Sequence, residues 1–503
     1  MERMNGIDPM FVYSDTRHTP MEIAYACVFD PSTADGGYSF ERVQGVLESR
    51  MPNLTPFRRR LMPVPLGLDN PRWVDDPDFD LSNHLHRDAA PAPGGADEFC
   101  DMVAEVMGRP LLPEQPPWEM HVVEGLAGGM IGLIAKVHHS VIDGVAGAAL
   151  LAQLLDLTPE GSAVINPCPP WMPAGLPTQR ELVADALPSF LRGPTRGLRA
   201  AREIGRTAVR MARCAVDATT GPIAIPLGAP RVFETPITAR REVRFAVLDL
   251  NEVRQLKDRF GSTINDVVLA VCSGALRSHL AANGRDPDTP LVAVVPVSVR
   301  PEQTDATGNQ LSAMFVTLAN DCKTPLERLR AVTEASASSK GQEHAVGYGP
   351  MAVRLAEAIP PAVAKPMIQL GVRSGIVRKA RPGNLMISNV PGPDFPLYFA
   401  GMELRAVYPL GPVMDGVSPL NITVQSYLNS LFVGINASAK ASPDLAGLAQ
   451  AMEDELLLLS KMANGAGPPR SAAVRHRRTP QAGGHRRAQS TSPQTPEPAD
   501  TPD

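Results

Sequence analysis

Two adjacent histidines follow an apolar run that constrains the fold more than any other part of the chain. The run from Met130 to Val137 predicts a buried strand. His138 and His139 come next, Asp143 follows, and the small and aliphatic residues 145–155 predict a helix against a core. The pattern therefore predicts a strand–loop–helix unit with two imidazoles and a carboxylate on the loop. Loops on a rigid scaffold often carry chemistry, and imidazole suits proton transfer near neutral pH.

Strand and helix patterns alternate through two similar halves of the chain, which predicts an α/β fold with mixed (α+β) sheets. The expected strands are Glu22–Phe29, Phe57–Met62, His121–Glu124, Met130–Val137, Glu242–Asp249, Leu291–Val299, Leu311–Leu318, Leu385–Val390 and the hairpin of Asn421–Leu428 with Leu431–Ser438. The expected helices are Phe40–Met51, Asp97–Gly108, Leu250–Phe260, Ile264–Ala282 and Pro443–Met462.

Two local signals fix how these elements join. Gly128 and Gly129 predict a turn that pairs the strand before them with the strand at Met130. Thr263, with Asp266 three residues later, predicts a capping box at the start of a long helix.

Shifts in composition predict four regions. We expect an N-terminal half at 1–165, a linker with an arginine-rich crossover helix at 166–236, a C-terminal half at 237–465 and a tail at 466–503. The linker is rich in Pro and Gly at both ends. The tail has almost no large apolar residue, which predicts disorder.

Composition excludes several classes of protein. The formal net charge of −5 gives no global attraction to nucleic acid, so no nucleic-acid partner is expected. The six cysteines are scattered without a CxxC pair, which predicts reduced thiols and a cytoplasmic protein. No apolar stretch approaches the ~18–20 residues of a spanning helix, and no signal peptide is evident.

The motif HHxxxDG at residues 138–144 resembles the signature of the CoA-dependent acyltransferase superfamily, and that motif alone also fits condensation domains of peptide synthetases. Further blocks narrow the resemblance to the bacterial wax ester synthase/diacylglycerol acyltransferase family, over about residues 5–462. These blocks are Met10–Pro31, Pro110-Leu111, Trp118-Glu119, Thr263–Ala270, Gly274–Arg277, Pro296–Arg300, Gly308–Gln310, Ser388–Pro393 and Leu420–Thr423.

The resemblance implies a soluble two-domain acyltransferase with a fold like that of chloramphenicol acetyltransferase. It would move a long-chain fatty acyl group from acyl-CoA to diacylglycerol or to a fatty alcohol, without a metal or organic cofactor. The second histidine of the family motif is the base, which maps to His139. The acid of the motif, Asp143, shapes the loop and pairs with an arginine, and Asn265 and Asp266 lie near the same centre.

An alcohol is a poor nucleophile and a thioester is already activated, so one base that removes the hydroxyl proton suffices. General-base catalysis raises the reaction rate by roughly 10²–10⁴-fold. No serine stands in a G-x-S-x-G context, so neither a hydrolase elbow nor a covalent acyl-enzyme is expected. His138 is expected to support the loop. His139 and Asp143 have a spacing that could hold a metal on a helix, but Gly144 favours a turn and no third ligand is evident.

The other candidate residues keep structural alternatives. Asn265 and Asp266 are either first-turn helix residues or part of the catalytic centre. Asn389 is either a turn residue or part of a substrate tunnel. Arg300 pairs either with Asp143 or with the phosphates of CoA.

Three departures from the family pattern bear on activity. Leu112 stands where the family usually has Asp, Pro117 stands where it usually has Leu before Trp-Glu, and Phe233-Glu234 stand where it usually has Asn-Gly. The first two leave open a second function, that of a catalytically weak lipid-binding protein that coats neutral-lipid bodies. A third alternative is a transferase for another acceptor, such as an amine or a polyketide alcohol.

Arginines recur every three or four residues in the expected crossover helix and form one stripe. Either the stripe is a solvated face, or it contacts an anionic bilayer at the inner face of the membrane or the surface of a lipid body. The stripe consists of Arg196, Arg199, Arg202, Arg206, Arg210 and Arg213.

Overall fold

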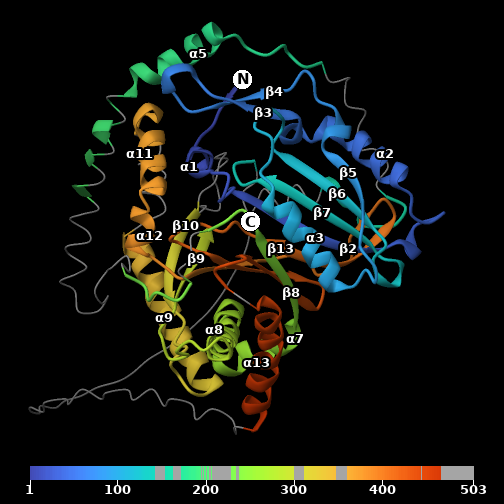
Figure 1. Cartoon of the computed structure of the whole chain (residues 1–503), viewed down its shortest axis with the longest axis vertical. Coiled ribbons are helices and arrows are strands. Elements are labelled where there is room, and N and C mark those ends of the chain that lie inside the picture. The colour runs from blue at the N-terminus through green and yellow to red at the C-terminus, as the bar shows by residue number, and fades with distance from the viewer. Residues whose placement is uncertain are drawn as a thin grey trace, which may run out of the picture. The chain divides into compact units, whose positions relative to one another are not determined.

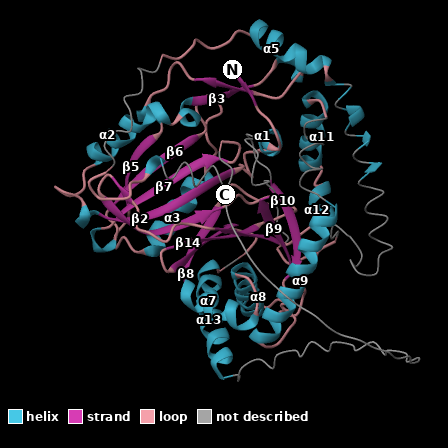
Figure 2. Ribbon diagram, turned by 180° about the vertical axis from the view of Figure 1, so that it is seen from behind, coloured by secondary structure: helices cyan, strands magenta, loops and turns pink. Residues whose placement is uncertain are grey.

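Two six-stranded sheets of mixed strand direction form the framework of the fold (Figures 1 and 2). The first sheet has the order β12-β13-β2-β7-β6-β5 and the second has the order β10-β9-β11-β14-β15-β8. The structure is a computed structural model. It describes residues 1–141, 153–161, 172–193, 195, 197–199, 201–202, 205–206, 228–233, 237–298, 311–346, 359–442 and 444–465. The mixed α/β fold class expected from the sequence is confirmed.

The elements that the sequence predicted lie close to their expected bounds, and others, such as the helices Pro325–Val346 and Pro361–Arg373, were not predicted. The strands are β1 Glu2–Arg3, β2 Glu22–Asp30, β3 Arg59–Met62, β4 Arg72–Asp75, β5 Leu85–Ala89, β6 Trp118–Glu124, β7 Ile131–His138, β8 Arg241–Asp249, β9 Val292–Ser298, β10 Leu311–Thr317, β11 Leu385–Val390, β12 Tyr398–Phe399, β13 Met402–Leu410, β14 Leu420–Tyr427 and β15 Ser430–Ser438. The helices are α1 Asp8–Ser14, α2 Phe40–Arg50, α3 Ala96–Gly108, α5 Gln179–Leu191, α7 Leu250–Phe260, α8 Ile264–Ala282, α9 Pro325–Val346, α11 Pro361–Arg373, α12 Ile376–Ala380 and α13 Leu445–Gly465.

The strand that ends at the paired histidines lies inside the first sheet. β7 pairs antiparallel with β2 on one side and with β6 on the other, and nearly all of its residues are buried. The turn between β6 and β7 places Gly128 and Gly129 at φ of 72° and 71°, where a side chain would be strained. The predicted pairing of these two strands is therefore confirmed.

A strand from far along the chain completes the first sheet. β13 pairs antiparallel with β2, and a register shift lies between Leu404 and Ala406. The sequence analysis did not predict β13, because Arg405, Pro409 and this irregularity interrupt the apolar alternation. The C-terminal part of the chain thus contributes to the N-terminal sheet. The division at 1–165, 166–236 and 237–465 stays a prediction.

The helices α7, α8, α9 and α13 gather beside the second sheet, as Figure 1 shows. α8 has the predicted bounds, and its predicted capping box is present: the Thr263 hydroxyl accepts from the Asp266 amide, and the Asp266 carboxylate accepts from the Thr263 amide. Most of α8 is buried, so it forms the centre of the C-terminal hydrophobic core.

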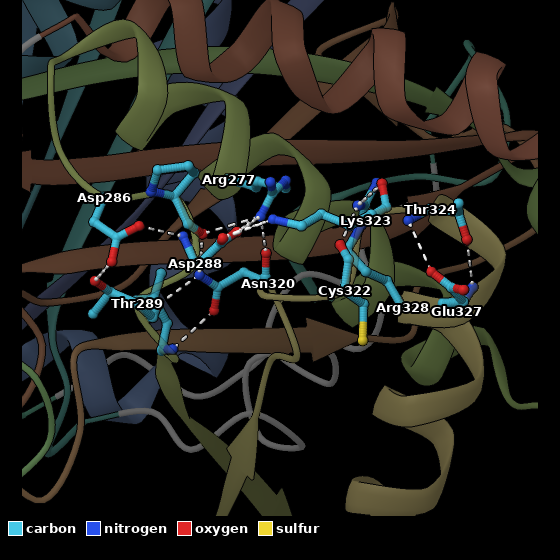
Figure 3. Close-up of polar contacts among 12 residues, drawn as sticks. Arg277, Asp286, Asp288, Thr289, Asn320, Cys322, Lys323, Thr324, Glu327 and Arg328 are labelled. Atoms are coloured by element: carbon cyan, nitrogen blue, oxygen red, sulfur yellow. Dashed lines mark hydrogen bonds and ion pairs between the residues drawn. The ribbon is translucent and has the colours of Figure 1, made fainter.

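A polar cluster at the end of this core joins three segments (Figure 3). Arg277 of α8 donates to Asp288 at 2.5 Å and to the carbonyl of Asn320 at 2.7 Å. The Asn320 side chain in turn donates to the carbonyls of Pro287 and Thr289 and accepts from the Leu291 amide. These bonds satisfy the backbone groups of the loops that flank β9 and α9.

None of the helices in the described part of the chain is long and apolar enough to cross a bilayer. The described cysteines, which are Cys27, Cys100, Cys272 and Cys322, are free thiols, as the sequence predicted. Burial raises the pKa of Cys27 and of Cys272 to about 12, so both thiols are uncharged and unreactive near neutral pH.

Candidate active site

The paired histidines lie where β7, an inner strand of the first sheet, ends. Glu22 of β2 lies opposite His138 in the antiparallel register. The next backbone amide, that of His139, donates to the carbonyl of Met21 at 2.8 Å. The backbone pairing with the segment before β2 therefore extends one residue beyond β7. This hydrogen bond fixes the backbone position of His139.

His138 is held as a neutral ring. Its Nδ1 accepts from the Ser140 amide at 3.2 Å and lies 2.7 Å from the Ser140 hydroxyl. Because Nδ1 accepts, the ring proton belongs on Nε2, which lies 3.7 Å from a carboxylate oxygen of Asp15. Burial, and secondarily the His139 charge, lowers the pKa of His138 to about 3. The ring therefore stabilises the turn rather than exchanging protons near neutral pH.

His139 lies in different surroundings. It is half-buried, and its ring stacks on Phe11 of α1 with 4.4 Å between ring centroids and 14° between the ring planes. This contact covers one face of the imidazole and fixes its plane. The side chain keeps part of its surface open, as a group that must meet a substrate requires.

A cavity of about 540 Å³ borders the end of β7. His138, Asp15 and Glu22 supply polar groups to its wall, and the described residues that line it do not include His139. The rest of the wall is largely apolar and comes from several segments. Its apolar lining includes Val12, Leu61, Pro63, Val64, Leu66, Pro71, Leu111, Leu112, Pro113, Pro117, Pro361, Ala362 and Pro366. A largely apolar cavity with a few polar groups is typical of a small-molecule site.

Two of the three carboxylates that line this cavity, those of Asp15 and Glu22, titrate close to neutral pH. Burial raises the pKa of Asp15 to about 6 and that of Glu22 to about 7, although Lys136 opposes the shift at both groups. Glu22 lies 3.0 Å from the Lys136 ammonium and accepts from the Leu111 amide at 2.7 Å. The sequence analysis missed both acids. Glu22 carried a usable signal, because it is an acid at the first position of a predicted buried strand.

Asn265 and Asp266 lie at the N-terminus of α8, beside the second sheet. The Asp266 side chain is buried, and its Oδ2 belongs to the capping box with Thr263. Its other oxygen, Oδ1, is buried and has no hydrogen-bond partner among the described residues. Asn265 is half-buried. Asp266 is therefore a first-turn helix residue that caps α8 through one of its carboxylate oxygens. A catalytic role for Asn265 and Asp266 stays a prediction.

Asn389 lies on β11 and not in a turn, so that structural alternative is wrong. The residue is half-buried and stands opposite Val424 of β14 in the parallel register. The turn signal came from the Pro391-Gly392-Pro393 sequence that follows the strand. Asn389 and Asp266 both belong to the C-terminal sheet and its helices, whereas His138 and His139 belong to the first sheet.

Several predicted residues lie outside the described ranges. These are Asp143 and Gly144 of the motif, Arg300, and Arg196, Arg210 and Arg213 of the arginine stripe. The remaining arginines of the stripe, Arg199, Arg202 and Arg206, are exposed.

Two of the departures from the family pattern, Leu112 and Pro117, lie on the cavity. Leu112 is exposed and Pro117 is buried, and both line the cavity wall. The carbonyl of Pro117 accepts from the His138 amide at 3.0 Å. Pro117 therefore still supports the histidine through its backbone, which a proline can do because it keeps its carbonyl.

Comparisons with known proteins cover nearly the whole chain. The family model described as "Wax ester synthase/diacylglycerol acyltransferase catalytic domain" matches residues 4–268, and that described as "WS/DGAT C-terminal domain" matches residues 307–460. A Mycobacterium tuberculosis (strain ATCC 25618 / H37Rv) protein named "Putative diacyglycerol O-acyltransferase Rv1760" is 36% identical over 471 residues, with 91% of this chain and 89% of that protein covered.

Solved structures show the same architecture. The wax ester synthase/diacylglycerol acyltransferase from Marinobacter aquaeolei VT8 has a TM-score of 0.66 and 26% identity, with 92% of this chain and 100% of that chain covered. The trichothecene 15-O-acetyltransferase TRI3 from Fusarium sporotrichioides has a TM-score of 0.56 at 11% identity, with 91% and 94% covered. The first condensation domain of the CDA synthetase has a TM-score of 0.55 at 14% identity, with 93% and 96% covered. The last two show the fold alone, and they confirm the two-lobed acyltransferase fold that the sequence predicted.

Proposed function

Because the chain belongs to the wax ester synthase/diacylglycerol acyltransferase family, we propose that it is an acyl-CoA-dependent O-acyltransferase. It transfers a long-chain fatty acyl group to diacylglycerol, to a fatty alcohol, or to both. The observation that carries the proposal is the pair of histidines at the end of β7, of which one borders a largely apolar cavity and the other keeps open surface. Two of the chain's relatives bear this activity in their printed names.

His139 acts as the general base in this proposal. It removes the hydroxyl proton of the acceptor while the oxygen attacks the thioester carbonyl, and a tetrahedral intermediate forms. The intermediate collapses with cleavage of the carbon–sulfur bond, and the imidazolium returns the proton to the CoA thiolate. Stacking on Phe11 supports this role, because a base must be held in one orientation to meet its proton.

His138 is a positioning residue. Its pKa of about 3 keeps it uncharged, and its bonds to Ser140 fix the turn that carries His139. By the resemblance to the family, Asp143 would shape this loop and pair with an arginine, for which Arg300 is the candidate, and Gly144 would support the turn. Arg300 also remains a candidate for the phosphates of CoA. Asn265, Asp266 and Asn389 support substrate from the C-terminal sheet.

The cavity receives the apolar acceptor from a surface beside α11. Leu66, which lines the cavity, is 86% exposed, so the cavity reaches the surface there. Val363, Met367 and Leu370 of α11 are also exposed, and their spacing of four and three residues places them on one face of the helix. An exposed apolar stripe of this kind is typical of a helix that lies in a lipid interface.

The charges around this stripe favour an anionic lipid surface. Residues 360–383 contain no acid, and the basic residues in the segment are Lys365, Arg373, Arg378, Lys379 and Arg381. The exposed arginines Arg199, Arg202 and Arg206 add to the positive charge of the chain's exposed segments. Basic side chains near an anionic membrane contribute about 1 kcal/mol each. We therefore place the enzyme in the cytoplasm with reversible contact to the membrane or to lipid bodies.

An acceptor panel tests the proposed function. Purified full chain is incubated with palmitoyl-CoA and, in separate reactions, with diacylglycerol, hexadecanol or a long-chain amine, while free thiol and acylated product are followed. Thiol release that depends on diacylglycerol or hexadecanol supports the proposal. Release only with the amine would assign another acceptor.

Lipid binding without turnover would favour the second candidate, a lipid-binding coat protein. The exposed face of α11 and the presence of Leu112 and Pro117 on the cavity wall are the observations that support this candidate. Its membrane contact is tested by sedimentation with anionic and neutral vesicles. Met367→Glu with Leu370→Glu should release the protein from anionic vesicles. Leu457→Glu, at an exposed leucine of α13, is the matched control and should not.

A further inference from the structure

Three side chains that can bind metal converge on the first sheet, away from the paired histidines. β5 and β6 are parallel neighbours, and His86 stands opposite His121 in their register. Glu119 lies two residues before His121, so its side chain leaves the sheet on the same face. One nitrogen of each histidine and one carboxylate oxygen of Glu119 all lie within 4.8 Å of one another.

His121 is oriented as a metal ligand would be. Its Nδ1 lies 2.7 Å from a carboxylate oxygen of Asp88, which holds the proton on that nitrogen. The side chain is more than nine-tenths buried, and its Nε2 has no hydrogen-bond partner among the described residues. A metal-bound histidine typically donates its second ring nitrogen to a carboxylate in this way, which leaves the first nitrogen's lone pair directed at the ion.

We propose that His86, Glu119 and His121 bind a divalent first-row transition ion, with Zn²⁺ as the best match. His121 Nε2 and Glu119 Oε1 are 3.5 Å apart. Two ligands about 2.0–2.2 Å from one tetrahedral ion lie about 3.3–3.6 Å from each other, so this pair already has the required separation. His86 is half-buried and can turn toward the ion, since its ring centroid lies 4.7 Å from that of His121.

The surroundings give the ion access and set its type. A cavity of about 650 Å³ is lined by His86, Asp88, Glu119 and His121, among others, and provides an entry path. The Lys136 ammonium lies 3.2 Å from Glu119 Oε1 and opposes a cation, whereas the Glu22 carboxylate, 3.0 Å from the same ammonium, offsets its charge. Two imidazoles favour Zn²⁺ or Co²⁺ over the oxygen-seeking Mg²⁺ and Ca²⁺.

The ion would have a structural role and would enter no step of acyl transfer. Among the described strands, β5 is the edge strand of the first sheet and pairs with β6 alone. A shared ion would tie the edge strand to β6 through side chains as well as through backbone hydrogen bonds. Metal that binds only the folded chain would then raise the melting temperature.

Titration of the metal-free full chain tests the site. The chain is dialysed against EDTA and then buffer, and Zn²⁺ and Co²⁺ are added while heat, Co²⁺ visible absorption and melting temperature are recorded. We expect one ion per chain from these residues, a higher melting temperature and no comparable response to Mg²⁺. His86→Ala and His121→Ala should each abolish this binding. Asp88→Asn should weaken it by about 10–100-fold, because it removes the carboxylate that orients His121.

Three results would overturn the proposal. Wild-type chain that takes up no ion would show that His121 is instead a proton-bridged partner of Asp88 and Glu119. Binding that persists in both His86→Ala and His121→Ala would place the ion elsewhere. The same conclusion would follow if the double variant His476→Ala, His485→Ala, which removes two histidines beyond residue 466, lost the whole response. His86 is half-buried, so its alanine variant should fold even if that of His121 does not.

Discussion

Lys136 and Arg328 are two buried cations that meet glutamate in different settings. Lys136 lies on β7, 3.0 Å from Glu22 and 3.2 Å from Glu119, and it donates to the carbonyls of Val106 and Arg109 where α3 ends. Arg328 of α9 lies 2.5 Å from Glu455 of α13, and both side chains are almost fully buried. Each cation is tied to carboxylates that burial would otherwise protonate.

The difference lies in what surrounds the carboxylate. Glu22 lines the cavity beside His138, and burial raises its pKa to about 7. Glu455 packs over Gly274 of α8, where an added Cβ would lie 2.1 Å from the carboxyl carbon. The first cluster can therefore change protonation beside a substrate at neutral pH. The second packs α8, α9 and α13 together, and burial raises the pKa of Glu455 as well.

Loss of the C-terminal pair should have the largest effect on stability. Arg328→Ala leaves Glu455 buried without its cation, and it also removes the bonds of Arg328 to the carbonyls of Cys322 and Lys323. Breaking a buried pair from one side costs about 3–5 kcal/mol. Chemical denaturation at pH 8 measures the loss. Arg330→Ala, an exposed residue on the same helix, is the control. A loss no larger than that of the control would mean that the pair is not structural.

Lys136→Met should destabilise the fold in a way that depends on pH. At pH 8 it leaves the buried Glu22 and the half-buried Glu119 carboxylates beside methionine, and we expect a loss of about 3 kcal/mol. At pH 6 the loss should be smaller, because Glu22 takes up a proton and no longer needs a cation. Denaturation at both pH values measures this difference, and Lys440→Met, an exposed lysine, is the control. An equal loss at both pH values would contradict the comparison between the two clusters.

Glu22→Gln should flatten the pH dependence of stability. The folded pKa of Glu22, about 7, lies above its ordinary value of 4.5, so the folded chain binds more protons than the unfolded chain between those values. Stability from this group is complete below pH 4.5 and is lost as pH rises through 7. The variant does not lose this stability as the pH rises. Part of the pH dependence remains in the variant, because the pKa of Asp15 is also raised, to about 6. Denaturation midpoints from pH 5 to pH 8 should therefore fall less in the variant.

The control for this experiment is Glu114→Gln, at an exposed acid, which should follow the wild type at every pH. Parallel curves for Glu22→Gln and the wild type would show that Glu22 is ionised throughout this range.

Leu112→Asp should have the smallest effect. It restores the residue that the family usually has, at an exposed position on the cavity wall. Substitutions at exposed positions change the free energy of unfolding by less than about 0.5 kcal/mol. A change of about 0.5 kcal/mol in the activation free energy of acyl transfer corresponds to about a twofold change in rate. Melting curves and initial rates of thiol release measure both quantities. A much larger gain in rate would show that Leu112 limits activity in this chain.

Long, strongly patterned elements could be predicted from the sequence. α8 has its predicted bounds because Thr263 and Asp266 form a capping-box pattern at its start and its apolar residues continue without a break. β7 and its turn at Gly128 and Gly129 were predicted equally well. β5 was missed because it is a polar edge strand, with His86, Arg87 and Asp88 among its five residues. Its pairing depends on β6, which local patterns do not show.

The site was predicted only where one segment carries it. His138, His139 and Asp143 come from a single stretch of sequence, so the motif could be read directly. Asp15 and Glu22 join the cavity through folding, since α1, β2 and α11 bring their residues together from distant positions. The raised pKa of Glu22 arises from burial, which a sequence pattern does not measure.

The central claim is that His139, held by Phe11 and supported by a neutral His138, removes the proton of the acceptor alcohol. The direct measurement is kcat/KM for acceptor-dependent thiol release by His139→Ala, beside its melting temperature. The account predicts a loss of about 10²–10⁴-fold with an unchanged melting temperature. A folded His139→Ala variant that transfers acyl groups within a few-fold of the wild-type rate, roughly 1 kcal/mol in the barrier, would contradict it.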